Sequence, residues 1–505
     1  MPASLPRTDL CALLGCRLPI MAAGMGGVAR SQLVAAVTQA GAFGFLGMVR
    51  EPLQLIEREV AAVRTAGHTR FGVNLIPAGT DPALLASQID LCIGLQVPVV
   101  GLFWEVNTAV VERLRAAGIV VVHQVGTAQA ALAAQHAGAH ALMVQGVEAG
   151  GHVHATQPLA EVLAEVLALA EVPVAAGGGL ADGRDVARVL AAGAQAGVLG
   201  TAFIATPESF AHDVHKQALL AAQGSDTVLT EDFHINWPPH SPVRVLQSAV
   251  TRGERGNPHD PNAPRTVIGE EEGRPIYLFS TDSPLRSMSG DFAAMALYAG
   301  CGVGRVQAIV PAAELVATLA REAAAHLRLL QEPAPEYSSP VCYAPEFQRQ
   351  RDEALAAQLN ELLEAERAGA RVTLETARAV PADQPALQAL VQAIQRDEVH
   401  WCGMLLRALR RLGAQPGTRT GDFYGKAMAV ADLRERLAFL NRGQGWVARR
   451  VRELLQGLDP EHEDLRADLQ AMLDGHVAQL AKVNAALGIE RRADTAPAAP
   501  ASQNS

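Results

Sequence analysis

Val172-Pro173-Val174-Ala175-Ala176-Gly177-Gly178-Gly179 is the stretch of this sequence that decides the fold. Its first half is apolar at every position instead of at alternate ones, which is typical of a strand covered on both faces in a parallel sheet. Its second half consists of glycines, which allow a backbone to come close to a ligand. The stretch therefore predicts a buried strand that ends in a ligand-binding loop.

Similar apolar runs recur through the first 210 residues, and each is followed by an amphipathic, alanine-rich stretch typical of a helix. Together with 172–175, these runs lie at 20–22, 43–46, 71–75, 99–102, 119–123, 141–144 and 197–199. Eight β-then-α units at regular spacing predict an α/β protein with a closed (β/α)8 barrel, the TIM barrel. An open, doubly wound parallel sheet is the alternative.

The rest of the chain divides by composition. We expect residues 1–330 to form the barrel, with a mainly helical segment inserted at about 225–304. Residues 331–345 begin with Gln-Glu-Pro-Ala-Pro and are predicted to be a linker. Helical stretches at 347–375, 384–412, 424–455 and 463–487 predict an antiparallel four-helix bundle over 346–490. Residues 491–505, rich in Ala, Pro and Ser, are predicted to be disordered.

Composition excludes several classes of function. The 505 residues carry a net charge of −10 with both signs interspersed, so no basic surface for nucleic acid is expected. No apolar run approaches the roughly 18 to 20 residues of a membrane span, and none predicts a membrane partner. The six cysteines lack CxxC spacing, and the first 18 residues lack the apolar core of a signal peptide. A cytoplasmic protein with reduced thiols is expected.

Two glycine-containing loops fall where (β/α)8 barrels commonly bind phosphate, after the seventh and eighth strands. Gly178 and Gly179 follow the seventh strand, and Gly200 and Thr201 follow the eighth. A helix start at 182–184 comes directly after the first of these loops. Because both clusters are at matching positions, we predict a cofactor that contains phosphate.

A second group of residues predicts a planar ring in the same mouth. The loop after the first strand is small, and amide side chains able to bond a flavin edge follow the third and fifth strands, at Asn74 and Gln124. The segment Glu148-Ala149-Gly150-Gly151-His152 places a histidine on a flexible loop. Its imidazole can act as an acid or base near neutral pH. Roles for His123 and His154 stay open.

Five ordered motifs make the first 330 residues resemble the nitronate monooxygenase family, formerly 2-nitropropane dioxygenases. They are Pro19-Ile20-Met21 with Gly24-Met25, Phe71-Gly72-Val73-Asn74, Glu148-Ala149-Gly150-Gly151-His152, Gly178-Gly179-Leu180-Ala181-Asp182-Gly183 and Gly200-Thr201-Ala202-Phe203. Gln124 and Ala202 depart from the family, many of whose members carry Lys and Arg there. We therefore expect less positive charge beside the cofactor.

The resemblance implies FMN as the cofactor and assigns residues to it. The implied contacts are Gly178, Gly179, Gly200 and Thr201 for the phosphate and Ala22, Ala23, Gly24, Asn74, Gln124 and Gly151 for the ring. His152 matches the family's catalytic base. Cys301 stands where related proteins often have glutamine, and we expect it to be a packing residue.

The activity implied by the resemblance is oxidation of alkyl nitronates or nitroalkanes by molecular oxygen to carbonyl compounds and nitrite. FMN carries the redox chemistry, and the protein orients the reactants. The flavin-dependent enoyl-acyl-carrier-protein reductases share the barrel and the glycine-histidine loop, so an NAD(P)H-dependent oxidoreductase is the alternative. A barrel that serves only as a scaffold is a third reading.

The helical region resembles an uncharacterised ferritin-like domain. Polar residues on its apolar stripes predict an inward set, namely Glu366, Asp397, His400, Glu435 and His476. Asp397 and His400 have the i, i+3 spacing of di-iron bundles, but Leu473 stands where the fourth helix would need a carboxylate. A buried polar network without metal is therefore expected. The bundle is also where we expect either a contact between copies of the chain or a protein partner.

Overall fold

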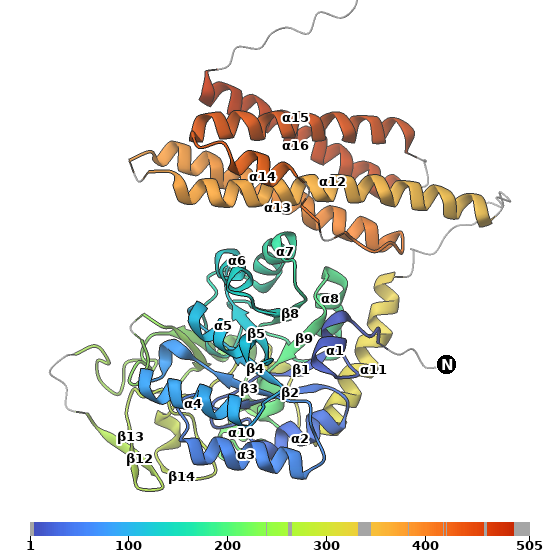
Figure 1. Cartoon of the computed structure of the whole chain (residues 1–505). Coiled ribbons are helices and arrows are strands. Elements are labelled where there is room, and N and C mark those ends of the chain that lie inside the picture. The colour runs from blue at the N-terminus through green and yellow to red at the C-terminus, as the bar shows by residue number, and fades with distance from the viewer. Residues whose placement is uncertain are drawn as a thin grey trace, which may run out of the picture. The chain divides into compact units, whose positions relative to one another are not determined.

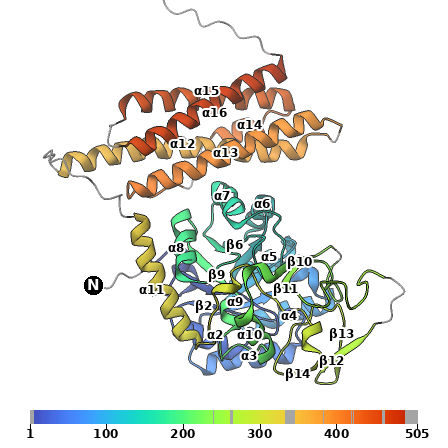
Figure 2. The ribbon, with the colours of Figure 1, turned by 180° about the vertical axis from the view of Figure 1, so that it is seen from behind.

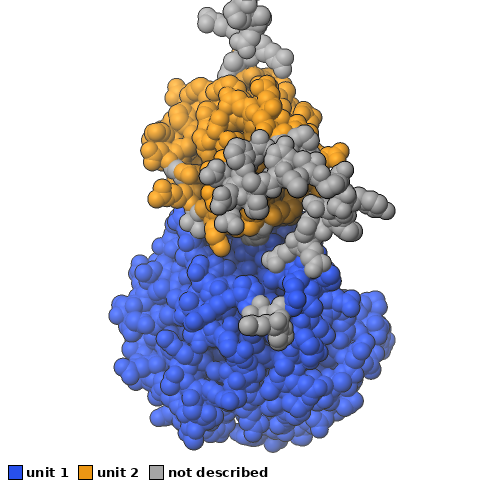
Figure 3. All heavy atoms as spheres, turned by 90° about the vertical axis from the view of Figure 1, so that its right-hand side faces the viewer, with its two compact units in different colours: residues 1–341 blue, residues 342–505 orange. Residues whose placement is uncertain are grey.

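The computed structural model describes residues 5–238, 240–260, 265–331, 345–381, 383–417, 419–420, 422–458 and 462–488. The chain forms two separate compact units, residues 1–341 and 342–505, coloured separately in Figure 3. The predicted linker, apart from its end residues, and the predicted disordered tail lie outside the described residues. No helix of the described part is long and apolar enough to cross a membrane.

The first unit is a closed barrel of eight parallel strands, which confirms the predicted (β/α)8 fold. Its strands, in order around the barrel, are β1 (Ile20–Ala22), β2 (Phe43–Gly47), β3 (Gly72–Leu75), β4 (Val99–Leu102), β5 (Val120–Val125), β6 (Ala141–Gln145), β8 (Val174–Gly177) and β9 (Ala196–Leu199). β9 closes the ring on β1 with Ile20 opposite Gly197. Figures 1 and 2 show the ring from opposite sides.

Helices surround the barrel, and one short helix contributes side chains to the apolar cluster in its interior. The outer helices are α2 (Ser31–Gln39), α3 (Leu53–Thr65), α4 (Pro82–Gly94), α5 (Thr108–Ala116), α6 (Ala128–Ala137), α7 (Leu159–Leu169), α8 (Gly183–Ala192) and α11 (Ala312–Gln331). Leu10 and Leu14 of α1 (Asp9–Leu14) join Phe43 and Phe45 in the apolar cluster inside the barrel. Side chains therefore fill the barrel interior, and the ligand site must lie at its mouth.

The helices start where short polar side chains can cap them. Thr127 accepts a hydrogen bond from the backbone of Ala130 at the start of α6, and Asn107 accepts one from Val110 at the start of α5. Such caps satisfy amide groups that lack a partner in the first helical turn. They fix where α5 and α6 begin.

The inserted segment is not mainly helical as predicted, since its described part forms strands and short 3-10 turns. β11 (Val243–Leu246) pairs with β10 (Thr227–Thr230) on one side and with β7 (Gly151–His152) on the other, while β12 (Val267–Glu271) lies between β13 (Arg274–Tyr277) and β14 (Met288–Gly290). The helical prediction failed because pairing with distant strands stabilises these short segments, and helical periodicity does not detect such pairing. α9 (Thr201–Ile204) and α10 (Asp213–Ala221) precede the segment.

The second unit is a bundle of four long helices, as the sequence predicts. These are α12 (Pro345–Ala379), α13 (Pro385–Arg411), α15 (Leu433–Gly457) and α16 (Glu463–Leu487), with the short α14 (Phe423–Met428) between α13 and α15. The predicted helix at 424–455 is divided because Asp432 starts a new helix by accepting a hydrogen bond from the backbone of Glu435. The apolar core of the bundle includes one residue from each long helix: Val372, Ile394, Leu437 and Val483.

Candidate functional site

A cavity of about 1000 Å³ lies at the mouth of the barrel. It is lined by Ala23, Gly24, Asn74, Gln124, Gly151, His152, Gly178, Gly179, Gly200 and Thr201, which are all the predicted site residues except Ala22. Ala22 is a buried residue of β1 and does not line the cavity. The fold therefore brings together residues from six barrel strands or the loops that follow them.

The glycines after β8 are required by the backbone itself. Gly178 and Gly179 have φ angles of 139° and 68°, which side-chain-bearing residues rarely adopt. A Cβ on Gly178 would lie 3.0 Å from the backbone nitrogen of Gly146. At Gly200 a Cβ would meet nothing closer than Met25 Sδ at 3.7 Å. Glycine is therefore needed at 178 for this backbone conformation and close packing, whereas the space beside Gly200 is open.

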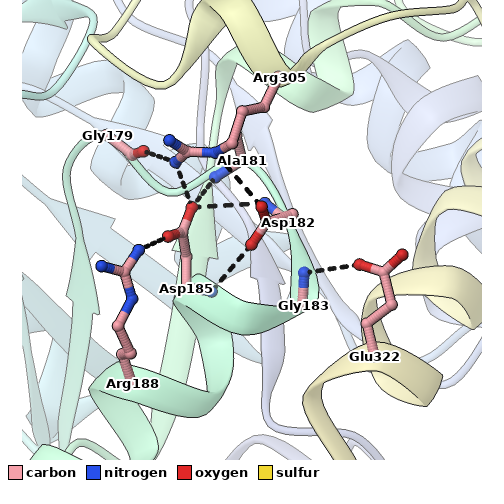
Figure 4. A network of polar contacts seen from close by, with 8 residues as sticks. All are labelled: Gly179, Ala181, Asp182, Gly183, Asp185, Arg188, Arg305 and Glu322. Atoms are coloured by element: carbon pink, nitrogen blue, oxygen red, sulfur yellow. Dashed lines mark hydrogen bonds and ion pairs between the residues drawn. The ribbon is translucent and has the colours of Figure 1, made fainter. Parts of the chain in front are cut away.

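A network of charged side chains bonds to the backbone of the glycine loop, residues 178–181 after β8 (Figure 4). Buried Asp185 accepts hydrogen bonds from the backbone of Ala181 at 2.7 Å and forms ion pairs with Arg188 and Arg305. Arg305 also donates to the carbonyl of Gly179 at 3.0 Å. The network fixes the loop's shape whether or not a ligand is bound.

The start of α8 is less available to a phosphate than the sequence suggested. Asp182 and Asp185 form a capping box there, and Glu322 accepts a hydrogen bond from the backbone of Gly183 at 3.1 Å. Asp182, Asp185 and Glu322 already accept hydrogen bonds from amide groups at this helix start, so those amides are not free to bind a phosphate. No side chain caps the start of α9, at Gly200 and Thr201. The open anion position is therefore between the glycine loop and α9.

On the opposite side, Asn74 orders the loop after β1. Its Nδ2 donates to the carbonyl of Gly24 at 3.3 Å. A Cβ on Gly24 would lie 2.4 Å from the Cβ of Asn74, so glycine is needed for this close approach. Gln124 lines the cavity from the end of β5. These small and amide groups fit the edge of a planar ring.

His152 is held in place by its backbone. Gln145 Nε2 donates to the carbonyl of His152 at 2.8 Å, and Gln145 Oε1 accepts from the backbone of His154 at 3.0 Å. His152 also pairs with Val243 of β11. One glutamine and one strand of the inserted segment therefore fix the histidine loop.

Aromatic rings surround the imidazole of His152. Trp237 stacks on it with ring centroids 3.5 Å apart, while Trp104 and Tyr298 lie 6.3 Å and 5.9 Å away. Burial, and secondarily the charge of Arg50, lowers the pKa of His152 to about 3. Its Nε2 is buried and has no hydrogen-bond partner in the described part of the chain. The imidazole is therefore neutral at physiological pH, and its buried Nε2 has an unused hydrogen-bonding capacity.

Arg50 and Glu51 place opposite charges in the wall of the cavity. Arg50 donates to the Oγ1 of Thr281 at 3.2 Å and to the backbone carbonyl of Asn236. Burial raises the pKa of Glu51 to about 7, which the charge of Arg30 partly opposes. Below that pH the net charge of this wall is positive, which favours an anionic ligand.

The remaining candidate side chains of the barrel lie outside the cavity lining. His123 is buried, its Nδ1 lies 2.9 Å from the carbonyl of Gln124, and burial lowers its pKa to about 4. His154 packs beside Trp104, with ring centroids 5.0 Å apart. The Sγ of Cys301 lies 3.8 Å from the Oγ1 of Thr227. None of the three contacts the space where a ligand fits.

Sequence reasoning missed Arg50, Gln145, Trp237 and Tyr298. Arg50 follows β2 and has a φ of 58°, a conformation that the sequence does not reveal. Trp237 and Tyr298 come from the inserted segment, far from the barrel motifs in sequence. Trp237 is one of only four tryptophans in the chain, which was the available signal.

In the bundle, the predicted inward set is partly wrong. Glu366 and His476 are fully buried, with Oε1 and Nε2 3.1 Å apart, but Asp397, His400 and Glu435 are exposed. Glu398 is the buried acid of α13. The error is one of helical phase, because one residue turns the side chain by about 100°. No group of three or more metal-binding side chains occurs among the described residues.

Comparison with known proteins follows the division into two units. The family model described as nitronate monooxygenase matches residues 7–322. A domain of unknown function, DUF6306, matches residues 352–485. The bundle therefore belongs to a domain family whose description does not confirm a ferritin-like relationship.

Three of the proteins that are similar to this chain illustrate its relationships. One is a protein of Rhodococcus jostii named (3aS,4S,5R,7aS)-5-hydroxy-7a-methyl-1-oxo-octahydro-1H-indene-4-carboxyl-CoA dehydrogenase. It is 35% identical to this chain, and the match covers 48% of this chain and 66% of that protein. A nitroalkane oxidase structure from Streptomyces ansochromogenes is 29% identical with a TM-score of 0.52 and covers 64% of this chain and all of that one. FabK of Thermotoga maritima is 26% identical with a TM-score of 0.56, over 65% of this chain and 99% of that one.

Proposed function

Since the chain belongs to the nitronate monooxygenase family, we propose that it is an FMN-dependent oxidoreductase that oxidises alkyl nitronates with molecular oxygen. The products are a carbonyl compound and nitrite. The relative named a nitroalkane oxidase supports nitro-compound chemistry. The observation that carries the proposal is a neutral imidazole, His152, with a free nitrogen in a cavity whose glycine loop fits a phosphate.

The residues of the mouth would hold FMN in two parts. Gly178, Gly179, Gly200 and Thr201 would bind the phosphate, and Ala23, Gly24, Asn74, Gln124 and Gly151 would contact the ring. When bound, FMN supplies the electron transfer from substrate to oxygen. We make no assignment to Ala22 beyond its place in the barrel wall.

His152 has a different task for each substrate form. With a neutral nitroalkane, its Nε2 would have to take the proton from the α-carbon. With a preformed nitronate, no proton transfer is required, and a hydrogen bond to the nitro group is enough. Because burial lowers the pKa of His152 to about 3, accepting a full proton is unfavourable. The site is therefore better suited to nitronates than to neutral nitroalkanes.

Arg50 supports the same preference. Burial raises the pKa of Tyr298, which the charge of Arg50 partly opposes, and the same charge adds to the effect of burial that lowers the pKa of His152. A cation in the cavity wall stabilises a bound anion, especially where apolar surroundings weaken the screening of charge. A nitronate carries its negative charge on the nitro oxygens, so binding close to Arg50 is favourable.

Oxidoreduction of an acyl thioester is the second candidate. It is favoured by the 35% identical relative named a carboxyl-CoA dehydrogenase. An NAD(P)H-dependent reductase resembling the enoyl-acyl-carrier-protein reductases belongs to the same substrate class. A cavity of about 1000 Å³ has room for more than a small nitronate beside FMN.

Anaerobic stopped-flow spectroscopy separates these functions. Flavin-loaded protein is mixed with propionate 3-nitronate, NADH, NADPH or butyryl-CoA, and flavin bleaching is followed. We expect fast bleaching by the nitronate and slow or no bleaching by the other three. Fast bleaching by NADPH, or by butyryl-CoA alone, would contradict the proposal and favour the second candidate.

A further inference from the structure

The helical bundle contains a cavity of its own, with a volume of about 470 Å³. Its walls come from α12, α14 and α15, and Glu398 of α13 reaches it. The apolar part of the wall includes Phe423, Phe439 and Leu440. The bundle is therefore hollow at one place, where well-packed helices ordinarily leave no space.

Buried polar groups lie at one end of this cavity. Glu398 and Gln444 are 2% and 3% exposed, and Gln444 Nε2 donates to Glu398 Oε1 at 2.9 Å. Gln444 Oε1 is buried and has no hydrogen-bond partner in the described part of the chain. A buried oxygen without a partner is costly, and it marks a position where a donor is missing.

Two glycines make room for this arrangement. A Cβ on Gly369 would lie 2.4 Å from Glu398 Oε2, and a Cβ on Gly443 would lie 2.6 Å from the ring of Phe423. Glycine inside a helix costs about 1 kcal/mol relative to alanine. Here the missing side chain of Gly369 leaves room for the carboxyl group of Glu398. The missing side chain of Gly443 leaves room for the ring of Phe423.

The charges around the cavity are predominantly negative. Glu361, Glu364 and Asp422 line it together with Glu398, whereas Arg442 is the basic residue among its described lining. Glu361 is paired with Arg450. Burial raises the pKa of Glu398 well above its usual range, to which the neighbouring Glu366 adds. The charge of His476 and the hydrogen bond from Gln444 only partly oppose this shift in the pKa of Glu398.

We propose that the bundle cavity binds an organic ammonium ion with an apolar body. The ammonium group donates to Glu398 and to Gln444 Oε1, which supplies the missing donor. The apolar body packs against Phe423 and Phe439, whose rings stack on one another in the cavity wall. A metal ion is disfavoured because no group of three metal-binding side chains is present among the described residues and most of the wall is apolar.

Titration calorimetry on the full-length chain tests this, with n-hexylammonium as the probe. Hexan-1-ol and hexanoate have a similar body with a neutral or negative head. We expect one hexylammonium bound per bundle and affinities at least about tenfold lower for the two controls, because hydrogen bonds to a charged group depend on that charge. Equal affinity for hexan-1-ol would show an apolar hole without charge recognition and would overturn the proposal.

Two matched variants locate the binding. Glu398→Gln removes the charge but keeps the shape, and we expect it to weaken hexylammonium binding about tenfold or more. Asp464→Asn removes an exposed acid at the start of α16, outside the cavity lining, and should leave the affinity within about twofold. Undiminished binding by folded Glu398→Gln protein would place the ligand elsewhere, including the barrel, and would refute the proposal.

A third variant tests the proposal even if the Glu398→Gln protein does not fold. Phe439→Ala should weaken hexylammonium binding several-fold, yet leave any binding of methylammonium unchanged because that ion has no long body. Equal hexylammonium affinity in this variant and the wild type would contradict the proposal. Tight binding of Mn²⁺ or Fe²⁺ with no binding of hexylammonium would also overturn it and identify a metal site.

Discussion

Replacing Gly200 with alanine should remove the flavin while leaving the barrel folded. Gly200 has a φ of −114°, which any residue adopts, and its Cβ would have free space to 3.7 Å. The substitution therefore creates no clash within the protein. At this position before α9, losing the glycine costs about 1 kcal/mol or less of stability.

The effect on FMN is larger. A methyl group on Gly200 would enter the space where we place the phosphate, between the glycine loop and α9. Each hydrogen bond to a charged group is worth about 1.5 to 3 kcal/mol, so disturbing one raises the dissociation constant roughly 10- to 100-fold. Riboflavin has no phosphate, and its weaker binding should change little.

Fluorescence titration of flavin-free protein with FMN and riboflavin measures both effects, with urea denaturation as the stability control. Gly253→Ala is the matched control: Gly253 has a φ of 74°, no atom near a Cβ and no place in the cavity lining. It should lose stability but keep FMN affinity. Equal weakening of FMN and riboflavin in Gly200→Ala, or unchanged FMN affinity, would refute the phosphate position.

Four other changes test separate parts of the account. His152→Asn should lose turnover of neutral nitroalkanes but keep appreciable oxidation of nitronates, as measured by oxygen uptake; equal losses would disprove its role as the base. Trp237→Ala should raise the pKa of His152 from about 3 toward 6.5, because removing the stacked ring admits water, and an unchanged imidazole titration in NMR would count against this cause. Glu51 loses its proton as pH rises through about 7, so KM for a nitronate should increase above that pH in the wild type but not in Glu51→Gln. A chain ending at residue 331 should keep its flavin absorbance, because every residue lining the barrel cavity precedes that point; loss of flavin would show that the bundle is needed.

The sequence predicted the barrel because its strands are mostly apolar instead of alternating, and burial between barrel interior and helices produces that pattern directly. It predicted Gly178 and Gly179 because a positive φ restricts the residue type. These are constraints that act on individual residues. They can be read without knowing which distant segments meet.

The errors come from interactions between distant segments. The inserted segment forms strands because β11 pairs with β7 and β12 with β14, contacts that its local composition does not encode. Trp237 stacks on His152 across 85 residues, so no local motif reveals the pair. In the bundle, Glu398 and not Asp397 is inward because the phase of a helix is fixed by all of its packing partners.

The central claim is tested most directly by measuring oxygen uptake and nitrite release together, in flavin-loaded protein supplied with propionate 3-nitronate. We predict that nitrite appears as oxygen is consumed, and that an equal concentration of 3-nitropropionate, whose nitroalkyl group still carries its α-proton, reacts much more slowly because His152 is a poor base. Flavin-loaded protein that consumes no oxygen and releases no nitrite with either compound would contradict the account.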